Sequence, residues 1–237
     1  MPRKTPRRTF LALAGGALIA PKFSFASFNF PTMLDHILLG CSGLDRGIAF
    51  VEQRTGVKAA FGGVHPGRGT CNALLSLGEM HYLEIIAPDP QQLEASDVYG
   101  VKKLTEPRLV SWAAHPGDIT QFAAGLRNRG IAFEGPIPGS RKRPNGRLLQ
   151  WQTLRLKDDH SKMLPFFIEW NARTVHPSAD APGGCKIDRF TISSPNDTEL
   201  QRLCSALGLD VRVEHAEKPQ LSARISGPNG VVMQVSS

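Results

Sequence analysis

A histidine and two glutamates interrupt apolar runs of this sequence, and they are the residues best suited to chemistry. His36 lies in "LDHILLG", Glu84 in "HYLEIIAPD" and Glu169 in "PFFIEW". A carboxylate buried in an apolar strand is costly unless it is paired or bound to a cation, and divalent cations accept imidazole and carboxylate together. Simpler interpretations stay open: His36 as a core histidine with a satisfied hydrogen bond, and Glu84 as the partner of a base such as Arg68.

The segment "GGVHPGRGTCN" is the second chemically informative stretch. Its four glycines predict a backbone that bends and allows a ligand to approach closely. Donors for a carboxylate or carbonyl oxygen are present at His65, Arg68, Thr70 and Asn72. A hairpin connection without a binding role is the alternative interpretation, because glycine-rich turns are common.

These residues fall within a repeated order of predicted elements. Strand-like and helix-like periodicity gives strand, helix and three strands over residues 34–90, and the same order over residues 108–171. A third, less complete copy covers residues 185–237. Pairing two such units would place the helices outside and curl the sheets around a shared cleft. We therefore expect an α+β fold, in which paired βαβββ modules form a cupped mixed sheet, followed by a third partial βαβββ-like unit. That unit could cover an edge, replace a second subunit or cap the cleft.

The layout resembles a known superfamily over residues 33–175. The segments "LDHILLGCSGLDRGIAFVEQRTG", "GGVHPGRGTCNALLSLG" and "YLEIIAPDP" are similar to the vicinal oxygen chelate superfamily and, within it, to the glyoxalase-like domain group. The resemblance implies two modules packed into a cupped sheet, with a divalent metal ion held by the first and last strand of each module.

Carried over to this sequence, the resemblance implies that His36, Glu84 and Glu169 are metal ligands. The fourth position falls at about Ser111 or Trp112, and neither is a good ligand. The sequence therefore departs from the four-ligand pattern. Metal-free binding of a small molecule stays open for this reason.

The metal-site hypothesis also gives roles to the other polar residues. His65 or Glu169 would act as the catalytic proton shuttle, and Arg68 and Asn72 would bind the substrate. His65 could instead supply the missing metal ligand, with His115 as a weaker candidate. The implied function is metal-assisted lyase, isomerase or dioxygenase chemistry on a small oxygen-rich molecule. The alternative is a metal-free binding protein of the same fold that sequesters a small molecule.

The first 26 residues predict an export signal. "MPRKTPRR" is basic, "TFLALAGGALIA" is a short apolar run, and "SFA" places small residues at the minus-three and minus-one positions of a cleavage site. Arg7 and Arg8 are followed by "TFL", which resembles the twin-arginine signal. We expect a periplasmic or otherwise exported protein that uses the twin-arginine export machinery and has no membrane span after signal removal. An ordinary secretory peptide or an uncleaved anchor is the alternative.

Composition excludes several other functions. The net charge of +7 falls nearly to zero without the leader, because 23 basic and 21 acidic residues remain, so we expect no nucleic-acid partner. The basic segment "SRKRPNGR" is expected to be a solvated loop. No nucleophile-elbow or phosphate-loop motif is present. The four cysteines form no CxxC pair, which argues against a zinc knuckle. A Cys185–Cys204 disulfide and buried free thiols both stay open, and the sequence does not indicate an oligomeric state.

Overall fold

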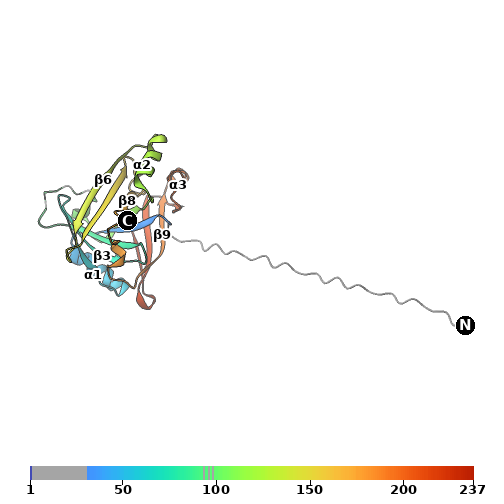
Figure 1. Cartoon of the computed structure of the whole chain (residues 1–237). Coiled ribbons are helices and arrows are strands. Elements are labelled where there is room, and N and C mark those ends of the chain that lie inside the picture. Colours follow the sequence, from blue (N-terminus) through green and yellow to red (C-terminus); the bar gives the residue numbers. More distant parts are fainter. Residues whose placement is uncertain (2–30, 93, 96, 98) are drawn as a thin grey trace.

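The computed structural model describes Met1 and residues 31–92, 94–95, 97 and 99–237, so the expected signal peptide lies outside the described residues except for Met1 (Figure 1). The elements, in chain order, are β1 (Leu34–Gly40), α1 (Leu44–Thr55), β2 (Ala60–His65), β3 (Thr70–Ser76), β4 (Tyr82–Pro88), η1 (Val101–Lys103), β5 (Arg108–Ala114), α2 (Ile119–Asn128), β6 (Phe133–Lys142), β7 (Leu148–Leu156), β8 (Phe166–Trp170), η2 (Pro177–Ala179), β9 (Lys186–Ser194), α3 (Asp197–Ala206), β10 (Arg212–His215), β11 (Gln220–Ser226), η3 (Pro228–Gly230) and β12 (Val232–Ser236).

Eight strands form one mixed sheet in the order β2-β3-β4-β1-β5-β8-β7-β6. Within each module the first and last strands are parallel neighbours, β1 beside β4 and β5 beside β8. The two modules meet through the antiparallel pair β1 and β5. The expected pair of βαβββ modules is therefore confirmed, and the first strand of each module lies in the middle of the sheet.

The edges of this sheet curl towards each other. A Cβ atom placed on Gly63 of β2 would lie 3.3 Å from the Arg141 side chain and 3.3 Å from the Lys142 carbonyl oxygen of β6. The Arg141 guanidinium also donates a hydrogen bond to Asn72 of β3. Because the two ends of the sheet converge in this way, its concave face becomes a cup.

The ends of two helices carry caps that suit their residue types. The Asp118 carboxylate accepts a hydrogen bond from the Gln121 backbone N–H at the start of α2, as expected for an N-cap. Gly56 ends α1 with a φ of 76°, a left-handed conformation that glycine adopts without a side-chain clash. None of the helices in the described residues is long and apolar enough to cross a bilayer.

Residues 185–237 form a second sheet of four strands in the order β10-β9-β11-β12. This unit has the expected order of elements but a different strand pairing. In the two modules the first strand lies beside the last, whereas β9 lies between β10 and β11. The pairing differs because α3 connects β9 to β10, which is the immediate parallel neighbour of β9.

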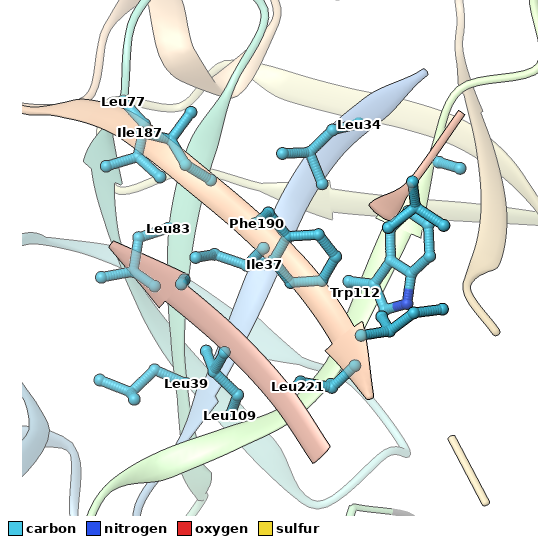
Figure 2. Packing of buried hydrophobic residues seen from close by; sticks show 14 of the residues in the cluster. Leu34, Ile37, Leu39, Leu77, Leu83, Leu109, Trp112, Ile187, Phe190 and Leu221 are labelled. Carbon is cyan, nitrogen blue, oxygen red and sulfur yellow. The ribbon is translucent and has the colours of Figure 1, made fainter. Parts of the chain in front are cut away.

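The second sheet packs on the convex face of the first and completes its core. Phe190 is fully buried against Trp112, with ring centroids 5.1 Å apart. Figure 2 shows this packing. Ile187 and Leu221 of the small sheet lie in one buried cluster with Ile37 and Leu39 of β1 and Leu109 of β5. The third unit therefore covers the back of the sheet and leaves the cup open on the other side. All four cysteines are buried and free.

Candidate functional site

The cup contains a cavity of about 380 Å³. Two differently composed walls enclose it. The first module contributes the polar wall, which includes His36, His65, Arg68, Thr70, Asn72 and Glu84. The second module contributes a mostly aromatic and aliphatic wall with a few charged groups, namely Glu134, Ile137, Arg141, Trp151, Thr153, Arg155, Phe166, Ile168 and Trp170. Such a cavity, apolar on one side and rich in hydrogen-bonding groups on the other, is typical of a small-molecule site.

His36 is buried between two carboxylates at the base of the cavity. Its Nδ1 lies 2.6 Å from Asp35 Oδ1, and its Nε2 lies 3.4 Å from Glu84 Oε2. The ring stacks on Tyr82, with centroids 4.4 Å apart. Burial opposes the charged form, but the hydrogen bonds and charges of the two carboxylates outweigh burial and raise the His36 pKa to about 9. Both ring nitrogens therefore donate, and His36 is an imidazolium at neutral pH.

A β-bulge in β1 places Asp35 beside the histidine that follows it. Leu34 pairs with Ala114 and His36 with Ala113, so the three residues of β1 face two of β5. The extra residue, Asp35, is thereby released from strict alternation, as bulged residues are. Its carboxylate turns along the strand to His36 Nδ1 instead of to the opposite face of the sheet.

Glu84 lies at the centre of the polar wall. The parallel pairing of β1 with β4 places it one strand away from His36, so the two side chains converge as the strand alternation predicts. Glu84 Oε1 accepts a hydrogen bond of 2.6 Å from Asn72 and lies 3.6 Å from His65 Nε2. Burial would raise the Glu84 pKa, but the His36 hydrogen bond and the nearby positive charge lower the pKa to about 2. The carboxylate is therefore ionised.

His65 is fixed by a chain of directed hydrogen bonds. Arg141 can only donate, so the Asn72 Oδ1 atom accepts from it at 2.5 Å. Asn72 Nδ2 must then donate to Glu84 and towards His65 Nε2 at 3.3 Å, while His65 Nδ1 donates to Thr70 Oγ1 at 2.8 Å. His65 Nε2 therefore carries the lone pair. Burial lowers the His65 pKa to about 4, which keeps this ring neutral.

Asp35 is a site residue that the sequence interpretation missed. Beyond His36, its carboxylate accepts a 2.9 Å hydrogen bond from Trp170 Nε1 and lies 3.3 Å from His176 Nε2. Burial would raise the Asp35 pKa, but the hydrogen bonds with His176 and His36 and the positive charge of His36 outweigh burial and hold this pKa far below its usual range. No local signal in the sequence indicates this contact, because adjacent residues of a strand normally face opposite sides of the sheet.

Arg141 is the second residue that was missed. The basic segment was expected to be a solvated loop, but β6 extends into it as far as Lys142, and the Arg141 and Arg143 side chains are buried. Arg141 lines the cavity. No local pattern indicates this, because the curl of the sheet brings β6 against the glycines of β2.

Glu169 does not join the other predicted ligands, and this part of the ligand hypothesis is wrong. On β8 the cavity-facing residues are Phe166, Ile168 and Trp170, so alternation turns Glu169 to the opposite face. There its carboxylate accepts a 3.0 Å hydrogen bond from the Ile119 backbone N–H. A carboxylate at a helix N-terminus is favoured by the unpaired N–H groups and the helix dipole. Glu169 therefore caps α2 instead of shuttling protons in the cup.

The donor set does not fit the four-ligand metal centre that the resemblance implies. On the cup side, the central strands of the second module present Ala113, Phe166 and Ile168. Trp112 lies in the opposite core and donates to the Met163 carbonyl oxygen, and Ser111 does not line the cavity. Across the described ranges, no three His, Cys, Asp or Glu side chains are arranged to hold a metal ion.

The charges at the polar wall also argue against the four-ligand metal centre. Both nitrogens of His36 already face carboxylates, and the Arg141 guanidinium lies one amide group away from Glu84. A positive charge so near disfavours a second cation in the same low-dielectric site.

The fold and the cup define the class of protein: an α+β chain whose curled mixed sheet of paired βαβββ modules is consistent with the vicinal oxygen chelate fold. The model of the family described as "Glyoxalase-like domain" matches residues 34–208, and the chain belongs to this family. The match continues beyond the second module to the end of α3, so the family pattern includes part of the third unit.

Several solved structures are similar to this chain at low sequence identity. A crystal structure of a hypothetical protein from Staphylococcus aureus is similar with a TM-score of 0.60 and 20% identity, over 85% of this chain and 84% of that chain. Streptomyces coelicolor methylmalonyl-CoA epimerase, in complex with 2-nitronate-propionyl-CoA, gives a TM-score of 0.44 and 21% identity, over 61% and 99% of the two chains. The methylmalonyl-CoA epimerase from Mycobacterium tuberculosis gives a TM-score of 0.43 and 16% identity, over 62% of this chain and 92% of that chain. No match was found among curated proteins.

Proposed function

We propose that this protein is an enzyme that transfers a proton on a small oxygen-rich molecule bound in the cup, in a reaction of the isomerase or lyase type. One observation carries the proposal: the ionised carboxylate of Glu84 lies in the cavity wall between a protonated imidazole, His36, and a neutral one, His65. Titratable groups whose environments separate their pKa values in this way are typical of acid–base sites.

His65 is the base in this scheme. Its Nε2 lone pair would give up the 3.3 Å contact with Asn72 Nδ2 and accept a proton from a carbon next to a carbonyl group, and the electron pair of the broken C–H bond would move to the carbonyl oxygen. The imidazolium formed would lie 3.6 Å from Glu84 Oε1, whose negative charge stabilises it, while Thr70 holds the other ring nitrogen. Return of the proton to another position of the substrate would regenerate neutral His65.

The surrounding groups support the same assignment. His36 and Asp35 hold Glu84 in place and keep it ionised, because the imidazolium donates to both carboxylates. Arg68 lies exposed at the cavity rim and offers donors to a substrate oxygen. General base catalysis of this kind typically contributes about 10²- to 10⁴-fold in rate.

The test is proton exchange, which does not require the overall reaction to be known. Phenylpyruvate and pyruvate are incubated with the full chain in D₂O, and loss of the C3 proton signal is followed by NMR. We expect exchange above the buffer rate, and a loss of roughly 10²-fold or more in His65→Asn. His215→Asn, an exposed histidine of β10, is the matched control and should exchange as the wild type does. Wild-type exchange at the buffer rate would end the proposal.

A metal-bound form is the second candidate, and one observation favours it. The Nδ1 atoms of His36 and His65 are held by Asp35 and Thr70, which directs both Nε2 atoms towards Glu84; ligating histidines are usually oriented in this way. Elemental analysis of protein purified without chelator distinguishes the two forms. Under the proton-transfer proposal EDTA leaves exchange unchanged. A stoichiometric divalent metal that is lost in His36→Ala would favour the second candidate.

The binding-protein alternative predicts affinity without turnover. A cup that retained a ligand through purification, yet exchanged no proton on any probe, would fit sequestration of a small molecule. Export through the twin-arginine machinery to the periplasm also remains our proposal, based on residues 1–26 alone.

A further inference from the structure

The guanidinium of Arg141 is a buried cation whose pairing is incomplete. Its side chain is 6% exposed, and its Nη1 donates to Asn72 Oδ1 at 2.5 Å. Its Nε atom is buried and has no hydrogen-bond partner in the structure. Within the described part of the chain, no carboxylate forms an ion pair with it; the nearest acidic group in this network, Glu84, is separated from it by the Asn72 amide.

The backbone of β2 makes room for this side chain. A Cβ atom on Gly62 would lie 3.0 Å from Arg141 Nη1 and 2.4 Å from Asn72 Oδ1, and one on Gly63 would lie 3.3 Å from Arg141 Cδ and Nη1. Any larger residue at either glycine would push the guanidinium away. The pair of glycines therefore holds Arg141 under β2 and against the cavity, a placement that packing alone would not favour for a charged group.

A buried, unpaired charge is costly, and burial accordingly lowers the Arg141 pKa. The cost falls when an anion binds against the guanidinium, and the planar fork of an arginine matches a carboxylate best. The other two cavity arginines are less suited to this role. Arg155 donates to the Tyr99 hydroxyl and stacks on Phe166, with 4.6 Å from its central carbon to the ring centroid, whereas Arg68 is exposed.

We infer that Arg141 is the anion-binding residue of the cup, and that the molecule bound there is an organic carboxylate with a flat apolar body. This inference rests on the proposed function in one respect only: it assigns the substrate class of the same cavity. The apolar body would lie against the aromatic part of the second-module wall, where Trp151 and Trp170 form an edge-to-face pair with centroids 5.6 Å apart, next to Ile168. The carboxylate would then reach Arg141 while the adjacent carbon faces His65.

Matched acid and amide probes test the carboxylate directly. Binding of phenylacetate, phenylacetamide and acetate to the full chain is measured by tryptophan fluorescence and by calorimetry, at low and at high salt. We expect phenylacetate to bind at least tenfold more tightly than phenylacetamide, which has the same shape without the charge, and more tightly than acetate, which lacks the apolar body. Equal affinities for the acid and the amide in the wild type, or no measurable binding of the acid, would overturn the inference without any variant.

A pair of arginine variants locates the effect. Arg141→Met should remove the preference for the acid, and Arg141→Lys should restore part of it because the charge returns without the fork. Arg147→Met is the matched control, since Arg147 is exposed and pairs with Asp180; it should keep the full preference. A full preference in Arg141→Met would also overturn the inference.

The two proposals fail in distinguishable ways. Tight binding of the acid with no proton exchange on phenylpyruvate would leave the carboxylate site standing and remove the proton-transfer enzyme. Equal exchange on phenylpyruvate and on its amide, abolished in His65→Asn, would support the proton-transfer enzyme and remove the carboxylate site.

Discussion

Raising the pH from about 6.5 to about 9 should destabilise this protein through one residue, His36. Its pKa is about 9 in the folded chain because Asp35 and Glu84 accept hydrogen bonds from both ring nitrogens, against an ordinary value of 6.5. In this range the native chain therefore holds one proton that the unfolded chain has lost. Stability falls with pH wherever the native state binds more protons. The His36 contribution is complete below pH 6.5 and is gone above about pH 9.

The size of the effect follows from the two pKa values. Each pKa unit corresponds to about 1.4 kcal/mol, so the difference between about 9 and 6.5 amounts to about 3–4 kcal/mol. His36 is only 2% exposed, and solvent screening of the pair is small. The free energy of unfolding should fall by about 1.4 kcal/mol per pH unit across the range. Domains of ordinary size have a total stability of about 5–15 kcal/mol, so the loss is measurable.

The assay is urea unfolding followed by tryptophan fluorescence at a series of pH values, with EDTA present so that no cation holds the ring. In His36→Gln the slope should disappear, whereas His215→Gln, at an exposed position, should keep the wild-type slope. His65 does not contribute in this range, because its pKa is lowered to about 4. The series stops at pH 9, because the buried thiols have raised pKa values and add their own loss above it. Equal slopes in the wild type and His36→Gln would refute the assignment.

Three further predictions follow from the packing, the cup and the leader. Phe190→Ala should lower the free energy of unfolding by about 3–5 kcal/mol in urea titrations, because this ring is fully buried between the two sheets; a loss below about 1 kcal/mol would contradict that packing. Gly62→Ala should weaken carboxylate binding in calorimetry by roughly tenfold to a hundredfold, because its Cβ would lie 2.4 Å from the cavity asparagine. Gly183→Ala, with nothing within 4 Å, should bind normally, and equal losses in both would refute the steric argument. Changing Arg7 and Arg8 together to lysine should retain the precursor in the cytoplasm on fractionation, and unchanged export would exclude a twin-arginine signal.

Local patterns in the sequence predicted the elements well. The period of apolar residues separated strands from helices, as the observed element order shows. Patterns of this kind act over a few residues, so they remain visible without tertiary structure. The repeated element order then predicted the two modules, and the family resemblance implied that His36 and Glu84 would lie together on neighbouring strands, where their side chains are 3.4 Å apart.

The same reasoning failed where side-chain direction depends on a distant partner. Glu169 lies in an apolar strand, as a buried ligand would, but its side chain faces away from the cup. Its carboxylate instead accepts a hydrogen bond at the start of α2. Alternation predicts that neighbours face opposite sides, and it does not predict which side is the cup. The bulge that turns Asp35 towards His36 arises from pairing with β5, which no local pattern contains.

The sequence by itself therefore determined the elements, their order and the presence of an imidazole and a carboxylate in buried strands, because propensity and periodicity are local properties. The tertiary structure decided which charges meet. It brought Arg141 from a segment that looks like a solvated loop to the Asn72 side chain, because two glycines in β2 leave space and the sheet curls until its edges touch. It also placed the third unit on the convex face, where Phe190 fills the core behind the cup. Burial and pairing across the fold, which depend on contacts between distant residues, set the protonation states that define the site.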